Sequence, residues 1–441
     1  MLRVPHSIRV LCGMRGRHRL RIAACLLLAA TCSTPAQVLA RPGIITTGLN
    51  ADPWWRQAVF YRIGTVSPAG ETSAAPLHPV ANYNSIAARL DTLHSLGVDA
   101  LLIPTPALPS SPAPDPALDD FDELVHQASL RGMRVLAAFP ASSANADLAS
   151  SARFWLSRGV AGFQLITPPG TSPQDSQSIL QDLRKITSGA VGQRIVISSF
   201  IPGASATPLA LPVSGLTSHD SSTRRAGRPG DSNTAQLQID SQLSQIDLPE
   251  AANLRSLLVQ SLLMPNLLLD FRPPAPPPSL PDPYPALARA MAAILLTTHS
   301  AALIDDDQAL ALQPDASPTL TRIATPPPPT LADWYSRLSA LHHGNPTVRY
   351  GSVSVLNFDS QNALVWVIRP ASRSSLSPPV VVACSLSPSP LQLSLTAAVH
   401  SLNLRGSYLL TLLRSDQGMG AQDLGSVTLP PFAVYIGELH R

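Results

Sequence analysis

Short apolar runs alternate with amphipathic helical patterns between Trp54 and residue 304, and this alternation predicts the fold class. Runs typical of buried strands lie at 58–63, 98–103, 133–139, 161–166, 194–197, 267–269 and 301–304. The intervening segments have helical periodicity; in one of them Ile86, Leu90 and Leu93 share a face. Strands that alternate with helices form parallel sheets with right-handed crossovers. So many units in series favour a closed (β/α)8 barrel over an open sheet.

After Asn345 the apolar period changes to two, which predicts a separate antiparallel β-domain. Short strands separated by Ser, Pro, Gly and Asn are expected at 353–355, 363–368, 380–383, 391–395, 408–413 and 432–436. A proline-dense hinge at 326–329 precedes a helical segment. We therefore expect the barrel at 41–330, a linking helix at 331–344 and a C-terminal β-sandwich at 345–441.

The N-terminus has the three-part pattern of a cleavable signal peptide. Four arginines from Arg15 to Arg21 precede an apolar run at 22–30, and small residues follow up to Ala40. We expect cleavage near Ala40 and export to the periplasm or the medium. The apolar run is too short to span a bilayer comfortably, so no stable transmembrane segment is expected in the mature chain. A lipobox-like stretch ends at Cys25, before most of the apolar run, so we do not expect a lipoprotein.

Composition narrows the classes of function. Charged residues make up 13% of the chain and aromatic residues 5%, and the formal net charge of +3 includes no dense basic stripe after the N-terminus. A nucleic-acid partner is therefore not expected. Removal of the signal peptide leaves Cys384 as the single cysteine. This excludes an internal disulfide and suits a small buried residue in a strand rather than a reactive thiol.

Several segments in chain order carry a resemblance to a known family. They are 54–63, 89–93, 96–101, 121–125, 131–135, 153–156, 158–163, 334–341 and 429–435. The most specific is Arg153-Phe154-Trp155-Leu156 with the Gly-Val-Ala-Gly-Phe that follows Arg158. Together they resemble glycoside hydrolase family 13, the α-amylase family, over nearly the whole mature chain. The resemblance implies a (β/α)8 barrel followed by an antiparallel β-domain.

The resemblance also implies a retaining mechanism, in which one carboxylate attacks the anomeric carbon and a second acts as acid and then as base. The nucleophile ends a Gly-Phe-Arg-Ile-Asp strand, but here Gln164 replaces the Arg and Ile166 replaces the nucleophile. Ser199 stands where the acid/base Glu is expected, and a hydroxyl is too weak an acid for that role. Phe271 stands, within one or two positions, where the third acidic residue of the family is expected, so all three acidic positions are vacant. The resemblance is therefore to a degenerate, non-catalytic member.

Three further departures point to the same loss. The Asp and Asn-His expected after the third strand are replaced by Ala-Phe-Pro-Ala-Ser at 138–142. The small domain that covers the cleft in the family is reduced to 143–149. The loop at 104–119 has no aromatic residue that would stack on a sugar ring.

Three consecutive carboxylates, Asp305, Asp306 and Asp307, follow the last predicted barrel strand and are weak candidates for substrate binding. They lie at the carboxyl end of the strand, which is the functional face of a barrel. Because consecutive residues in a strand point to opposite sides, all three cannot face inward, and a solvated loop is favoured. A Ca²⁺ site would need six to eight oxygens from several segments.

Other groups offer weaker chemistry. His219 and Asp220 follow no strand, so we interpret them as surface residues. His342 and His343 end a helix, where capping is favoured over metal binding. Ser199 has no Gly-x-Ser-x-Gly turn around it, which argues against a serine hydrolase. We therefore expect no metal and no cofactor.

Three hypotheses for function remain open. The first is an exported, non-catalytic amylase-like protein that binds an oligosaccharide or another protein. The second is an active glycosidase, an α-glucan hydrolase or transferase, with a relocated acidic pair at the barrel mouth. The third is a scaffold whose mouth is filled by side chains such as Ile166 and Phe271.

Overall fold

The computed structural model describes residues 53–63, 83–105, 115–140, 148–167, 173–200, 235–245, 250–264, 266–271, 284–306, 330–356, 360–372, 376–416 and 418–441. All described residues belong to one compact unit of the chain, Asp52–Arg441. The expected signal peptide, the His219-Asp220 pair and Asp307 lie outside the described residues.

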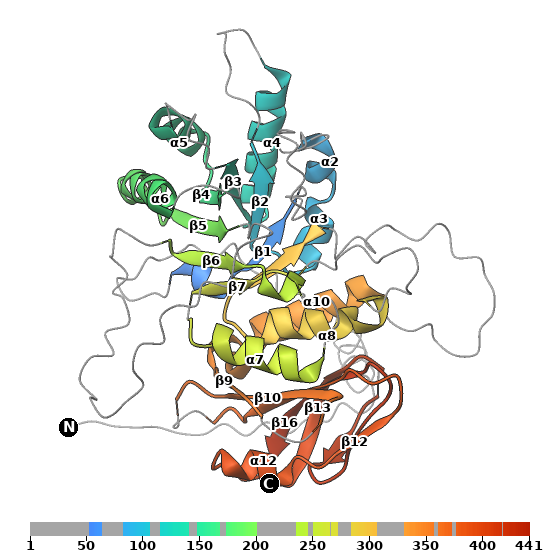
Figure 1. Ribbon diagram of the computed structural model, residues 1–441. Coiled ribbons are helices and arrows are strands. Elements are labelled where there is room, and N and C mark those ends of the chain that lie inside the picture. Colours follow the sequence, from blue (N-terminus) through green and yellow to red (C-terminus); the bar gives the residue numbers. More distant parts are fainter. Residues whose placement is uncertain are drawn as a thin grey trace, which may run out of the picture. The chain divides into compact units, whose positions relative to one another are not determined.

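Eight strands form one parallel sheet that curls into a barrel, which confirms the predicted fold class (Figure 1). They are β1 Val59–Arg62, β2 Ala100–Pro104, β3 Arg134–Pro140, β4 Gly162–Thr167, β5 Ile195–Phe200, β6 Leu237–Asp240, β7 Leu267–Leu269 and β8 Ala302–Asp305. Their order is β7-β6-β5-β4-β3-β2-β1-β8, so β7 and β8 are the two ends of the hydrogen-bonded ladder. These two strands meet at a seam, where the ring closes.

One short helix, η1 Trp54–Gln57, precedes β1, and the helices that follow the strands cover the outside of the barrel. They are α2 Tyr83–Ala88, α3 Leu90–Ser95, α4 Pro116–Leu130, α5 Leu148–Ser157, α6 Pro173–Ser188, η2 Gln242–Gln245, α7 Ala251–Ser261 and α8 Tyr284–Thr297. The start of α4 is fixed by Asp115, whose carboxylate accepts a hydrogen bond from the backbone N–H of Ala117, and by Pro116 in the first turn. The helix at Tyr83–Ser95 is broken at Arg89 into α2 and α3.

The C-terminal residues form an antiparallel sandwich. After α10 Leu331–Gly344 and α11 Pro346–Tyr350 come β9 Ser352–Val355, β10 Ala363–Arg369, β11 Val380–Ser385, β12 Leu391–Leu393, α12 Thr396–Ser401, β13 Tyr408–Arg414, β14 Ala421–Asp423, β15 Val427–Leu429 and β16 Val434–His440. Six strands form a sheet in the order β14-β13-β16-β11-β10-β9, and β12 pairs with β15 in a second sheet.

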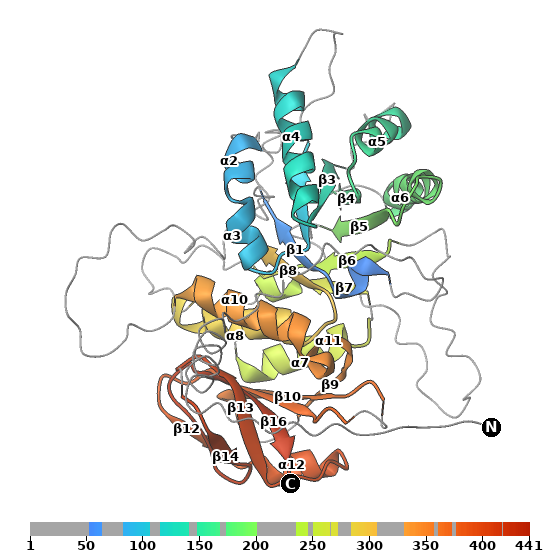
Figure 2. The ribbon, with the colours of Figure 1, turned by 180° about the vertical axis from the view of Figure 1, so that it is seen from behind.

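The core has separate layers inside and outside the barrel. Inside, alternate residues such as Phe60, Leu102, Leu136 and Ile197 form one buried cluster. Outside, the opposite faces of the strands join α7, α8 and the C-terminal sheet in a single larger cluster. Both views place α7 and α8 between the barrel and that sheet (Figures 1 and 2).

The structure contains elements that the sequence pattern did not predict, among them α11, α12, β14 and β15 in the C-terminal part, and one helix begins earlier than expected. The structure has a strand, β6, that the sequence pattern did not predict, and its four residues follow the long 202–234 segment. The helix α4 begins at Pro116, within the segment expected to be a loop. Among the described residues, none of the helices has both the length and the apolar character that a bilayer crossing requires.

Candidate functional site

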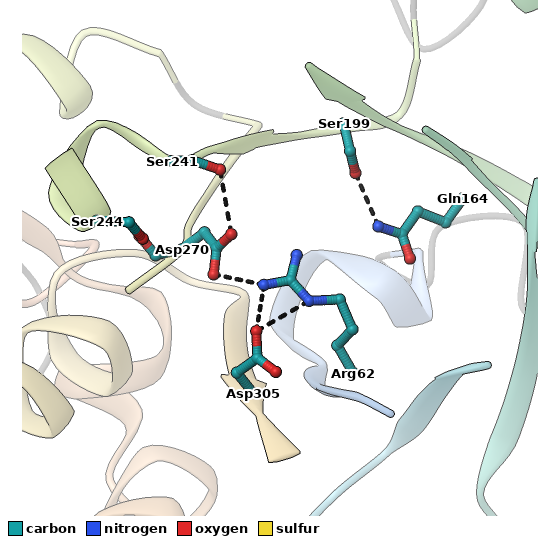
Figure 3. A network of polar contacts seen from close by, with 7 residues as sticks. All are labelled: Arg62, Gln164, Ser199, Ser241, Ser244, Asp270 and Asp305. Carbon is teal, nitrogen blue, oxygen red and sulfur yellow. Dashed lines mark hydrogen bonds and ion pairs between the residues drawn. The ribbon is translucent and has the colours of Figure 1, made fainter. Parts of the chain in front are cut away.

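The carboxyl ends of the barrel strands converge at one face, which we call the barrel mouth. Parallel strands bring the last inward-pointing residue of each strand to this face. The inward-pointing polar residues at the mouth are Arg62, Gln164, Ser199, Ser241, Asp270 and Asp305 (Figure 3). Each charged member of this set is at most 4% exposed.

The structure brings two of the three positions expected to be catalytic side by side. Ile166 of β4 pairs in register with Ser199 of β5, and both are buried. Gln164 lies two residues before Ile166 on the same face of β4, and its Nε2 donates to Ser199 Oγ at 2.8 Å. The pair is a neutral amide–hydroxyl contact with no carboxylate in it.

The third position, Phe271, lies in a different layer. Its ring belongs to the cluster outside the barrel, at 5% exposure. The inward-pointing residue at the end of β7 is its neighbour Asp270. A carboxylate therefore does occupy the mouth at this strand, and its partners decide what it can do.

Arg62 holds both buried carboxylates of the mouth. Its Nη2 donates to Asp270 Oδ1 at 2.6 Å and also contacts Asp305 Oδ2, to which Nε donates at 3.1 Å (Figure 3). Ser241 Oγ donates to the other oxygen of Asp270 at 3.1 Å. Ser244 Oγ donates to the Asp270 backbone carbonyl at 3.0 Å. Burial alone would lower the pKa of Arg62, but the charges of Asp270 and Asp305 raise it above its ordinary value.

The Arg62 cluster lies at the seam of the barrel. Arg62 ends β1, Asp305 ends β8 and Asp270 follows β7. Backbone ladders join β1 to β8, whereas the strand order places β7 and β8 at opposite ends of the sheet. The guanidinium thus links the two ends of the ladder by side-chain contacts. This is a structural use of both carboxylates.

Asp306 points to the outside of the barrel. Its Oδ1 accepts from Tyr61 at 2.6 Å and from Arg89 Nη2 at 2.7 Å. Burial and then the charge of Asp306 raise the pKa of the Tyr61 hydroxyl. The expected solvated loop is therefore wrong for Asp305, which is 1% exposed in β8, and for Asp306, which is partly buried. Both carboxylates are paired because each lies on a packed face at the end of β8: Asp305 contacts Arg62 inside the barrel, and Asp306 contacts Tyr61 and Arg89 outside it.

Asp240, at the end of β6, has a different environment. Burial raises its pKa, the nearby Asp270 adds to the rise, and a hydrogen bond from the Gln242 N–H at 3.0 Å opposes it. The alternation of β6 directs Leu237 and Ile239 inward, so Asp240 lies on the outer face. Its visible role is to cap the turn into η2.

Sequence reasoning missed Arg62, Asp270, Tyr61 and Arg89 as members of these clusters. The sequence did contain one indication of the Arg62 cluster, because Arg62 is a charged residue within the otherwise apolar run at 58–63. A buried arginine needs a carboxylate partner. That argument predicts a partner without saying which of the distant aspartates provides it.

The geometry limits the chemistry of the mouth. A retaining glycosidase places its two carboxyl groups about 5 to 5.5 Å apart with the scissile bond between them. Here Asp270 and Asp305 contact the same nitrogen of Arg62, so the guanidinium occupies the space between the carboxylates. Within the described ranges, no group of three or more His, Cys, Asp or Glu side chains is placed to hold a metal ion.

The histidine pair and the cysteine have structural partners. His342 Nδ1 lies 2.9 Å from the Leu296 carbonyl oxygen, and His343 Nε2 lies 2.9 Å from Asp99 Oδ2. Cys384 is buried in β11, and burial raises the pKa of its thiol. A buried protonated thiol is unreactive, which agrees with the interpretation of Cys384 as a core residue.

A (β/α)8 barrel joined to a C-terminal antiparallel sandwich is the architecture of the α-amylase-type enzymes, and solved structures of that class share it. A trehalose-6-phosphate hydrolase from Bacillus licheniformis superimposes with a TM-score of 0.60 at 13% identity, over 88% of this chain and 100% of that chain. An isomaltulose synthase from Klebsiella sp. LX3 gives 0.59 at 15% identity, with the same coverage of both chains. A mutant of a trehalulose synthase gives 0.59 at 14% identity. This likeness establishes the fold.

A comparison of sequences adds a short match. The chain is 36% identical to the trehalose-6-phosphate hydrolase of Escherichia coli (strain K12) over an alignment of 97 residues, which covers 19% of this chain and 17% of that relative's length. No family model matches the chain.

Proposed function

We propose that this chain is an exported, non-catalytic protein with the α-amylase-type fold that binds an oligosaccharide or another protein. In this proposal the signal peptide at 1–40 is removed near Ala40. The barrel at 41–330 and the sandwich at 345–441 are joined by the helix at 331–344. Neither nucleic acid nor a membrane anchor takes part.

The observation that carries the proposal is the engagement of Asp270 and Asp305 by Arg62. A carboxylate that acts as a nucleophile must approach the anomeric carbon of a bound sugar. A buried ion pair resists such use, because removing one partner leaves an uncompensated charge in a low-dielectric site. The carboxylates at the mouth are thus supports of the barrel seam.

The neighbouring strands give the proposal independent support. Ile166 offers no lone pair and Ser199 is hydrogen-bonded to Gln164, so β4 and β5 provide neither a nucleophile nor a strong acid at this level. The proposal takes Ile166, Ser199 and the Phe271 region as the positions at which the catalytic carboxylates of the family have been lost.

A second candidate is an active glycosidase acting on α-glucosides. Asp240, whose pKa is raised by burial and then by Asp270, is the observation in its favour, because a raised pKa suits a general acid. The names of the similar proteins, hydrolases and synthases of glucosyl disaccharides, agree with such chemistry. This alternative requires Asp240 to turn inward and Arg62 to release a carboxylate.

One assay distinguishes the two candidates. Protein beginning at Arg41 is incubated at high concentration with maltooligosaccharides, trehalose and sucrose, and sugar release is followed over a long period. The proposal predicts no release above that of the Asp240→Asn and Asp270→Asn variants. Release that survives repurification, disappears in these variants and persists in Asp91→Asn, an exposed carboxylate paired with Arg131, would establish the glycosidase. Without release, titration with the same glycans tests the binding role.

A further inference from the structure

The end of the barrel opposite the mouth, which we call the barrel floor, has a group of cations without matching acids. The floor is formed by residues that precede or begin the strands, and its central residues are Trp54, Arg134, Gln193 and Arg194. The guanidinium of Arg134 lies 4.4 Å from the centroid of the Trp54 ring. Trp54 itself is packed over the barrel interior, with its ring 6.0 Å from that of Phe60.

Backbone and side-chain contacts hold these residues in place. The Trp54 indole N–H donates to the Gln193 carbonyl at 2.9 Å, and the Trp54 backbone N–H donates to Gln193 Oε1 at 3.4 Å. Arg194 Nε donates to the Val191 carbonyl at 3.1 Å, which leaves its two terminal nitrogens free of that contact. The turn carrying Gln193 and Arg194 is thereby fixed beside the Trp54–Arg134 stack.

Asp99, the acidic residue whose charge acts on Arg134, already has two partners of its own. Asp99 Oδ2 accepts from the Val59 backbone N–H at 2.8 Å and contacts His343 at 2.9 Å. A hydrogen bond with Asp99 raises the pKa of His343, so the imidazolium form balances the charge of Asp99. Burial, and also the charge of Arg194, lower the pKa of Arg134, whereas Asp99 acts in the opposite direction.

Neighbouring arginines on the same side of the barrel show the ordinary arrangement. Arg131 pairs with Asp91 at 2.7 Å, and Arg158 pairs with Asp122. Among the residues that the structure describes, Arg134 and Arg194 have no carboxylate within ion-pair distance. Both are half-buried, so their terminal N–H groups remain within reach of a solute. The charge of Arg194 acts on the Arg134 guanidinium, and two nearby cations are electrostatically unfavourable without a counter-ion.

We propose that the barrel floor binds a phosphate group between Arg134 and Arg194, with Gln193 as an additional donor. The planar guanidinium groups can each donate two N–H groups to the oxygens of a phosphate. The indole of Trp54 stacks on the guanidinium of Arg134 and so fixes its orientation. The ligand is free phosphate or a small phosphate monoester. This inference is independent of the proposed function, because the floor and the mouth lie at opposite ends of the strands.

Binding is tested with the mature chain by calorimetry and by tryptophan fluorescence, with inorganic phosphate as the probe and sodium chloride of equal ionic strength as the reference. Glycerol phosphate is titrated in parallel to tell a monoester site from one for free phosphate. We expect saturable binding of at least one of the two. Arg134→Gln and Arg194→Gln should each weaken it about tenfold or more, because each removes a charge-assisted contact.

The matched control is Arg131→Gln, which removes a neighbouring arginine whose charge is balanced by Asp91, and it should leave the affinity within about twofold. Trp54→Phe should abolish the fluorescence response while calorimetry still detects binding. Equal affinity in the wild type and both glutamine variants would overturn the proposal, as would a response no larger than that to chloride. If Arg134→Gln fails to fold, Arg194→Gln alone decides.

Discussion

At the scale of single residues, Arg62 decides how the barrel mouth is used. Its guanidinium contacts Asp270 and Asp305, and all three side chains are nearly inaccessible to solvent. In such a site each charge depends on its partner, because water does not replace a lost contact. Loss of any one partner would therefore destabilise the fold, and the ion pairs make the two carboxylates unavailable to a substrate.

Replacement of Arg62 by Met should expose that dependence. The variant leaves two buried carboxylates unpaired and should lose about 3 to 5 kcal/mol of unfolding free energy, measured by urea denaturation. Adding Asp270→Asn and Asp305→Asn should restore part of the loss, because the unpaired charges disappear. The matched control Arg131→Met removes an exposed ion pair with Asp91 and should change the unfolding free energy far less than Arg62→Met. A triple variant no more stable than Arg62→Met would contradict this account of the cluster.

A second residue-scale prediction concerns pH. The hydrogen bond that His343 donates to the Asp99 carboxylate raises the pKa of His343 above its ordinary value of 6.5, outweighing the effect of burial. A raised pKa in the folded state stabilises the protein below pH 6.5, and this stabilisation is lost as pH rises through the raised value. Burial lowers the pKa of the adjacent His342. The effect of His342 on stability is therefore opposite: its stabilisation is present above pH 6.5 and is lost as pH falls through the lowered pKa.

The test is to measure melting temperature against pH for the wild type, His343→Gln and Asp99→Asn. The destabilisation caused by His343→Gln should be largest below pH 6.5 and should shrink as pH rises. It should not exceed about 1 kcal/mol, because both partners are partly exposed and screened by solvent. A loss that grew with pH would show that the neutral imidazole is the stabilising form.

At the scale of elements, β4 needs the glycine at its start. Gly162 has φ +153°, and a Cβ placed there would lie 2.1 Å from the carbonyl oxygen of Ile195 in the neighbouring strand. The ladder between β4 and β5 leaves no room for that atom. The close approach of the two strands therefore depends on this residue.

Gly162→Ala should lower the unfolding free energy by about 2 kcal/mol or more, because it adds a backbone clash to an unfavourable φ. Gly132→Ala is the matched control, since Gly132 has φ +76° but would place its Cβ in open space. Its cost should stay near 1 kcal/mol. Thermal denaturation of the two variants decides the matter, and equal costs would mean that the clash is relieved by a small shift of β5.

At the scale of the whole molecule, apolar periodicity predicted the barrel and the sandwich, because both depend on buried strand and helix faces. The strand β6 escaped prediction because its four residues contain two apolar positions, Leu237 and Ile239, which face inward only once the ring is closed. The start of α4 at Pro116 was missed because a proline in a helical first turn resembles a loop signal.

The candidate site was harder to predict than the fold. The proposed loss of acidic residues at Ile166 and Ser199 follows from the resemblance to the α-amylase family, which assigns those positions to the expected carboxylates. The Arg62 cluster could not, because its members lie 208 and 243 positions apart in the chain and meet only at the barrel seam. Likewise, the opposite orientations of Asp305 and Asp306 depend on the exact end of β8.

The most direct test of the account is a search for the covalent intermediate that a retaining glycosidase must form. The mature protein is incubated with an activated fluorinated α-glucoside, which traps such an intermediate, and its intact mass is measured. We predict an unchanged mass, because the mouth offers no free carboxylate nucleophile. A stoichiometric increase by one glycosyl unit, absent from Asp270→Asn or Asp305→Asn, would contradict the account and identify an active glycosidase.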